Sequence, residues 1–86
     1  MARVVVYTTS MCPYCVRAKR LLQARGIAYD ETDVSEDDEL RADVIRRTGR
    51  RTVPQIFIDD RAIGGYDELA ALDASGELAV LLKDAG

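Results

Sequence analysis

The sequence predicts one α/β domain in which a small mixed sheet carries helices on both of its faces. The chain has 86 residues, which is the length of a single domain. Its apolar segments follow strand-like and helix-like patterns in the order β-α-β-α-β-β-α. A β-α-β unit makes its two strands parallel through a right-handed crossover, whereas a two-residue turn makes the last two strands antiparallel. The sheet is therefore mixed, and the helices pack on both faces.

The first half of the chain contains the β-α-β unit. Residues 3–8 are mostly β-branched or aromatic, which predicts a buried strand. The helix expected over residues 13–25 starts with Pro13, whose missing N–H is not needed in a first turn, and Gly26 ends it. Residues 27–33 alternate apolar and polar side chains, which predicts a second strand with one face in solvent.

A second helix is expected from Glu36 to Thr48. Ser35 is its expected N-cap, since a serine hydroxyl can accept a hydrogen bond from a free N–H of the first turn. Four carboxylates follow directly, at the positive end of the helix, where the simplest interpretation is a solvated helix start. Gly49 is expected to end this helix.

The last third of the chain predicts a hairpin followed by a helix. Residues 55–59 and 61–63 form two short apolar runs around an Asp-Asp turn, which is typical of antiparallel strands. A helical pattern begins at Tyr66 and is interrupted near residues 75–76.

Composition excludes several classes of function. The net charge of −3 and the pI near 4.8 argue against nucleic acid and anionic membranes as partners. The apolar runs are far shorter than the ~18 residues of a membrane helix. The apolar stretch near the N-terminus is too short for a signal peptide, so we expect a cytoplasmic protein.

Two cysteines, Cys12 and Cys15, are the most informative residues. A disulfide between them would close a very short loop and stabilise the fold little, so a chemical role is favoured. The pair lies where a strand passes into a helix. Unpaired N–H groups and the positive helix end stabilise a thiolate there, which is the reactive form of cysteine. We expect Cys12 to be the nucleophile and Cys15, one turn further, to be the resolving thiol.

Two other interpretations of the cysteine pair stay open. Structural zinc normally takes four cysteine or histidine ligands, and the chain has two cysteines and no histidine. A zinc-binding module would need carboxylates or a second chain to complete such a site. Two inert core cysteines are disfavoured because Pro13 and Tyr14 separate them at an exposed junction.

Three motifs together resemble the glutaredoxins, most closely the small bacterial dithiol type. They are Cys12-Pro13-Tyr14-Cys15, Thr52-Val53-Pro54 and Gly64-Gly65-Tyr66-Asp67. The resemblance covers essentially the whole chain, as one domain over residues 1–86. It implies a thioredoxin-like fold with a four-stranded sheet, no tightly bound cofactor, and glutathione as co-substrate. It also implies a monomer that reduces disulfide-containing or glutathionylated client proteins.

The resemblance further implies a glutathione-binding groove beside Cys12. Pro54 is expected to be cis, so that the backbone of Val53 can pair with glutathione. Either Arg50 or Arg51 is expected to meet the glycine carboxylate of glutathione, and Arg51 is counted among the groove residues. The groove residues expected on this basis are Tyr14, Arg51, Thr52, Val53, Pro54, Gly65, Tyr66, Asp67 and Glu68.

One position departs from the family pattern. Many glutaredoxins carry a lysine or arginine three residues before the first cysteine, where this chain has Thr9. Two other functions remain as alternatives: a thioredoxin-like electron donor reduced by a flavoprotein reductase, and an iron–sulfur carrier in which two chains and glutathione share a cluster. Pro13 stiffens the loop, and dithiol members with this motif usually hold no cluster.

Overall fold

A computed structural model describes residues 3–84 of the chain. Eight elements follow one another in this part of the chain: β1 (Val4–Thr8), α1 (Pro13–Ala24), β2 (Asp30–Asp33), α2 (Asp38–Thr48), β3 (Gln55–Ile58), β4 (Arg61–Gly64), α3 (Tyr66–Ser75) and α4 (Glu77–Asp84). The expected order of strands and helices is confirmed, and the interruption near residues 75–76 separates α3 from α4.

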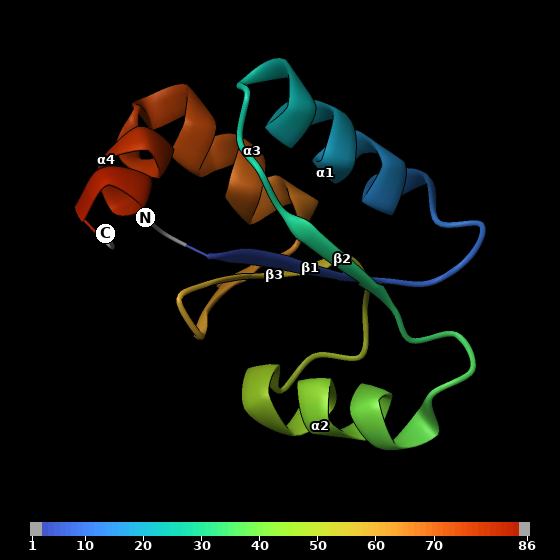
Figure 1. Ribbon diagram of the computed structural model, residues 1–86. Helices are drawn as coiled ribbons and strands as arrows, with labels where there is room; N and C mark the ends of the chain where they lie inside the picture. The colour runs from blue at the N-terminus through green and yellow to red at the C-terminus, as the bar shows by residue number, and fades with distance from the viewer. Residues whose placement is uncertain (1–2, 85–86) are drawn as a thin grey trace.

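The four strands form one mixed sheet in the order β2-β1-β3-β4. β1 is parallel to β2 and antiparallel to β3, and β4 completes the antiparallel hairpin with β3. Helices α1, α3 and α4 cover one face of the sheet, while α2 lies on the other (Figure 1). The expected sheet with helices on both faces is confirmed.

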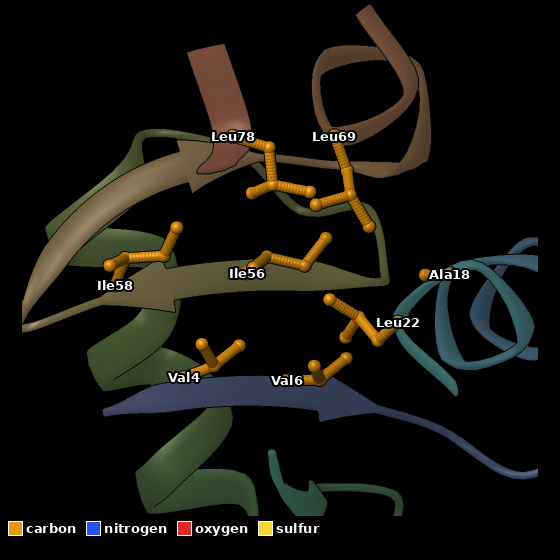
Figure 2. Close-up of a cluster of buried hydrophobic side chains, with 8 residues drawn as sticks. All are labelled: Val4, Val6, Ala18, Leu22, Ile56, Ile58, Leu69 and Leu78. Carbon is orange, nitrogen blue, oxygen red and sulfur yellow. The ribbon is translucent and has the colours of Figure 1, made fainter. Parts of the chain in front are cut away.

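The main core lies between the sheet and the three helices on its first face. Val4 and Val6 of β1 and Ile56 of β3 point towards Leu22 of α1 and Leu69 of α3 (Figure 2). Each fully buried side chain of this kind stabilises the fold by about 1.5–3 kcal/mol. Because α1 contributes to this core, its N-terminus is held at a fixed position beside the end of β1.

The opposite face of the sheet packs against α2 through fewer side chains. The rings of Tyr7 and Phe57 meet edge-on, with centroids 5.4 Å apart. The guanidinium of Arg47, from α2, lies 4.3 Å from the centre of the Phe57 ring. This cation–π contact adds to the burial of Val44 and anchors α2 on the sheet.

Strand β2 is shorter than the sequence pattern predicts. It begins at Asp30, not at Ile27. Gly26 adopts a left-handed conformation with φ +68°, and the N–H of Ile27 donates to the carbonyl oxygen of Leu22 at 2.9 Å. Ile27 thus closes the end of α1 and packs against the core, although its alternating neighbours resemble a strand.

The N-cap predicted for α2 is wrong. Asp37 caps the helix, and its carboxylate accepts a hydrogen bond of 3.0 Å from the N–H of Leu40. The Ser35 hydroxyl instead accepts from the backbone N–H of Ser10 at 2.8 Å, in the loop before Cys12. Several residues in this acidic run can cap a helix, and the contact with Ser10 decides which one does so.

None of the helices in the described range is long and apolar enough to cross a membrane.

Candidate active site

Cys12 is the N-cap of α1. Its backbone is extended, with φ −114° and ψ 103°, and its Sγ accepts a hydrogen bond of 3.1 Å from the N–H of Cys15. A sulfur atom therefore occupies the place that a serine or aspartate oxygen takes in most capped helices. Pro13 follows at the first helical position, as predicted. An anion on Cys12 is stabilised here by the N–H and by the positive end of the helix.

The loop before β3 lies against Cys12. The Cys12 thiol donates to the carbonyl oxygen of Val53 at 3.6 Å, although the two residues are 41 positions apart. The Val53–Pro54 peptide bond is cis, as expected. The Val53 backbone faces the sulfur atom, so that an extended peptide bound to Cys12 can pair with it.

Cys15 is the buried member of the pair. Only 2% of its surface is exposed, whereas Cys12 is partly exposed. Burial, followed by the hydrogen bond with Cys12, raises the pKa of Cys15 to about 12. At neutral pH Cys15 is therefore a thiol, and Cys12 is the sulfur that an incoming substrate meets first.

A groove of about 160 Å³ adjoins the Val53 loop. Eight of the nine residues expected to contact glutathione line it: Tyr14, Thr52, Val53, Pro54, Gly65, Tyr66, Asp67 and Glu68. Arg51, the ninth, is exposed and does not line the groove. Its neighbour Arg50 lines the groove. The structure therefore favours Arg50 as the arginine that contacts glutathione, a choice that the sequence left open.

Glu68 explains why Arg50 turns inward. Its Oε1 accepts a hydrogen bond of 2.9 Å from the N–H of Gly65 and pairs with the Arg50 guanidinium. The Gly65 N–H, and then Arg50, hold the pKa of Glu68 below its usual value. An acidic residue three positions after a helix cap is a sequence signal for such a contact, but it does not reveal which arginine joins it.

Gly64 makes room for this carboxylate. Its φ is +122°, and a Cβ atom at this position would lie 2.5 Å from the Glu68 Oε1 and 2.8 Å from its Cγ. Only glycine fits both the conformation and the space. Gly64 is therefore required by the packing of α3 against β4.

Two tyrosines form one wall of the groove. The rings of Tyr14 and Tyr66 lie 6.4 Å apart at an angle of 37°. Arg17, one turn along α1, stacks its guanidinium 5.4 Å from the centre of the Tyr14 ring. Arg17 thus brings a positive charge to the edge of the groove beside Tyr14.

Within residues 3–84, no three histidine, cysteine, aspartate or glutamate side chains gather so that they could hold a metal ion.

A dithiol at the start of a helix, facing a cis-proline loop across one end of a mixed four-stranded sheet, defines a thiol–disulfide oxidoreductase of the thioredoxin-like fold. The family profile described as Glutaredoxin matches residues 4–63. The chain is 52% identical over 83 residues to Glutaredoxin 3 of Escherichia coli K12, covering 96% of this chain and 100% of that protein. It is 49% identical to Glutaredoxin of Pseudomonas aeruginosa, covering 96% and 99% of the two chains.

A solved structure gives the same relationship in three dimensions. The crystal structure of a buckwheat glutaredoxin–glutathione complex superposes with a TM-score of 0.89 at 32% identity, over 96% of this chain and 78% of that one. The chain belongs to the glutaredoxin family and is thus a glutathione-dependent thiol–disulfide oxidoreductase. The resemblance found in the sequence motifs is confirmed.

Proposed function

We propose that Cys12 and Cys15 act in turn to reduce protein disulfides and glutathione mixed disulfides, with glutathione bound in the groove beside Val53. The observation that carries this proposal is the position of the Cys12 sulfur. The sulfur accepts a hydrogen bond from the N–H of Cys15, which favours a thiolate, and it lies beside the Val53 backbone, where an extended peptide can bind.

The first step is an attack by the Cys12 thiolate on one sulfur of a disulfide. A bond forms between that sulfur and Cys12, and the original S–S bond breaks. The departing thiolate takes a proton from water. The product is a mixed disulfide on Cys12, either with a client protein or with glutathione.

The second step depends on what Cys12 carries. A client held by two cysteines is released when the Cys15 thiolate attacks the Cys12 sulfur, which closes the Cys12–Cys15 disulfide. Two glutathione molecules then reduce this disulfide and leave as glutathione disulfide. Where Cys12 carries only glutathione, a second glutathione thiolate attacks the glutathionyl sulfur and frees Cys12 without the help of Cys15.

The groove supplies a partner for each polar end of glutathione. The first N–H groups of α3, at Tyr66 and Asp67, lack partners within the helix and can receive the γ-glutamyl carboxylate. The exposed Asp67 carboxylate can meet the ammonium group. Arg50 is placed for the glycine carboxylate, and the Val53 backbone pairs with the cysteinyl residue of glutathione.

The setting proposed for this activity is the cytoplasm. A dithiol that cycles between reduced and oxidised forms suits a compartment in which glutathione is mostly reduced. We propose that the chain acts there as a monomer on disulfide-containing or glutathionylated client proteins.

Two substitutions test the division of labour between the cysteines. Cys12→Ser should abolish all activity in an assay coupled to glutathione reductase and NADPH. Cys15→Ser should retain reduction of a small glutathione mixed disulfide and lose reduction of a protein disulfide, because only the latter needs a second thiol. Retained activity in Cys12→Ser would contradict the proposal.

The source of electrons needs its own test. The wild-type chain is incubated with NADPH and either glutathione with its reductase or a thioredoxin reductase. We expect turnover with the glutathione system only. Recycling by the flavoprotein alone would identify a thioredoxin-like donor instead.

A further inference from the structure

A chain of polar side chains joins α1 to the sheet just behind the cysteine pair. The Thr8 hydroxyl, at the end of β1, donates to the Oε2 of Glu31 at 2.9 Å. Glu31, from β2, in turn accepts two hydrogen bonds from the ammonium group of Lys19, at 3.2 and 3.0 Å. Because Thr8 is buried and fixed in the sheet, it holds Glu31, and Glu31 holds the lysine.

Lys19 is placed on the side of α1 that carries Cys15. The two residues are four positions apart, so their side chains are neighbours on one face of the helix. The lysine side chain is only 27% exposed, which is low for a residue that usually extends into water. Its hydrogen bonds with Glu31 keep it positively charged, since they raise the pKa of Lys19.

Cys15 faces few groups that could favour its thiolate. Burial, the hydrogen bond with Cys12 and the charge of Cys12 all raise its pKa, while a backbone contact at Thr9 and the charge of Lys19 lower it. Once Cys12 carries a client, its negative charge is gone. Burial then opposes ionisation of Cys15, and the Thr9 backbone and Lys19 are the groups that favour it. Glu31 and Tyr29 act on Lys19, not directly on Cys15.

We infer that Lys19, held in place by Glu31 and Thr8, is a positioning residue for the resolving step, in which its ammonium group stabilises the thiolate of Cys15. This inference rests on the proposed order of the two cysteines. It assigns a role to an ion pair that does not line the groove, and the role is confined to reactions in which Cys15 attacks.

The step assisted by Lys19 is balanced as a thiol–disulfide exchange. Cys15 loses its proton to water and its thiolate attacks the Cys12 sulfur. The bond between Cys12 and the client sulfur breaks as the Cys12–Cys15 disulfide forms. The client leaves as a thiolate and is reduced by two electrons, and the cysteine pair is oxidised by the same two.

The resolving step can be observed alone with an aromatic disulfide whose thiolate product is coloured. Mixing the reduced protein with one equivalent releases a first thiolate when Cys12 attacks and a second when Cys15 resolves the mixed disulfide. The second phase is intramolecular, so its rate does not depend on concentration. Stopped-flow absorbance between pH 6 and pH 10 measures this rate in wild type, Lys19→Gln, Lys19→Arg and Arg20→Gln.

Lys19→Gln should slow the second phase about 3-fold at neutral pH. The loss of thiolate on removal of the Lys19 charge is partly offset because a thiolate of higher pKa is a stronger nucleophile. Since burial keeps Cys15 mostly a thiol, the rate of the second phase should rise with pH in both proteins. Lys19→Arg, which keeps the charge, should restore most of the rate. Arg20→Gln removes an exposed charge from the same helix and is the matched control.

Two outcomes would overturn the inference. They are a Lys19→Gln rate equal to that of Arg20→Gln, and no recovery in Lys19→Arg. If Lys19→Gln does not fold by circular dichroism, Lys19→Met is used and must show the same slowing of the second phase. The measurement needs no glutathione, so failed turnover with glutathione would contradict the proposed function and leave this result unaffected.

Discussion

The N–H of Cys15 donates a hydrogen bond of 3.1 Å to the sulfur of Cys12, so the two reactive residues are coupled before any disulfide forms between them. This bond stabilises an anion on Cys12. Burial of Cys15, and then its side-chain hydrogen bond with Cys12 and the charge there, raise the pKa of Cys15. Burial keeps Cys15 a thiol at neutral pH, so it does not compete with Cys12 for the first attack, as the proposed two-step reaction requires.

Gly64→Ala should be among the most destabilising single substitutions in the groove. Its Cβ would lie 2.5 Å from the Glu68 Oε1, and a φ of +122° is strained for alanine. Backbone strain and overpacking together should cost about 3 kcal/mol. Urea unfolding followed by circular dichroism measures this change in the free energy of unfolding.

Gly49→Ala is the matched control for Gly64→Ala. Gly49 also has a positive φ, +71°, but no atom lies within 4 Å of the Cβ position. The control should therefore lose only about 1 kcal/mol, the conformational part of the cost. Equal losses in the two variants would show that contact with Glu68 does not decide the effect.

The charge of Glu68 should stabilise the fold in a pH-dependent way. Its pKa in the folded state lies below the ordinary value of 4.5, so its contribution is fully present above that value. The contribution is lost as the pH falls through the lowered pKa. Glu68→Gln keeps an oxygen for the Gly65 N–H but removes the charge. It should cost about 0.5–1 kcal/mol at pH 7, because the pair with Arg50 is half-exposed.

The test for Glu68 is urea unfolding of wild type and Glu68→Gln at several pH values from 7 downwards. The difference in free energy should disappear in acid. Glu77→Gln removes a carboxylate from the first turn of α4 and serves as the comparison. A difference for Glu68→Gln that stays constant into acid would mean that the amide disturbs packing and that the charge contributes nothing.

The sequence predicts the fold well where local patterns and packing agree. The apolar run of β1 and the Gly26 stop of α1 are examples, and both are reinforced by the core. Prediction from the sequence fails where several neighbouring residues could take the same structural role and a distant contact decides which of them does so. Asp37, not Ser35, caps α2 because Ser10 engages the Ser35 hydroxyl from another loop.

The same limit applies in the groove. Arg50 and Arg51 are equivalent in the sequence, and their difference arises from Glu68, which lies 18 positions away from Arg50. The motif residues themselves were foreseeable because each requires a specific chemistry: a thiol at a helix start, a proline that can be cis, and glycines where no Cβ fits.

Asp60→Gly should stabilise the protein. Asp59 and Asp60 form the two-residue turn between β3 and β4, with φ values of +48° and +66°. A positive φ at both residues is typical of a type I′ turn, which favours glycine at its second position. Glycine adopts this left-handed conformation without strain. The substitution should therefore add about 0.5–1 kcal/mol to the free energy of unfolding and raise the melting temperature by about 3–6 °C.

Asp59→Gly provides the contrast in the same turn. The Asp59 carboxylate accepts a hydrogen bond of 2.8 Å from the N–H of Arg3, which glycine would lose. This variant should gain nothing in thermal unfolding followed by circular dichroism. Equal stabilisation by the two substitutions would mean that the contact with Arg3 has no net value.

Arg50 and Arg51 should differ in their effect on glutathione binding. Arg50 lines the groove and is held there by Glu68, whereas Arg51 is exposed outside it. An exposed charge pair contributes up to about 1 kcal/mol, so Arg50→Gln should raise the KM for a glutathione mixed disulfide by about 2- to 5-fold. The kcat should change little, because the carboxylate of glutathione is bound equally before and during sulfur exchange.

Arg51→Gln makes the same change in charge one residue further along the chain, and its KM should stay within about 2-fold of wild type. The pair of variants therefore separates a specific contact from the general attraction of a basic segment, since the latter would affect both equally. Added salt should reduce the difference between Arg50→Gln and wild type, because the ions screen a half-exposed charge pair. A larger effect at Arg51 would mean that glutathione draws that side chain into the groove and would restore the assignment made from the sequence.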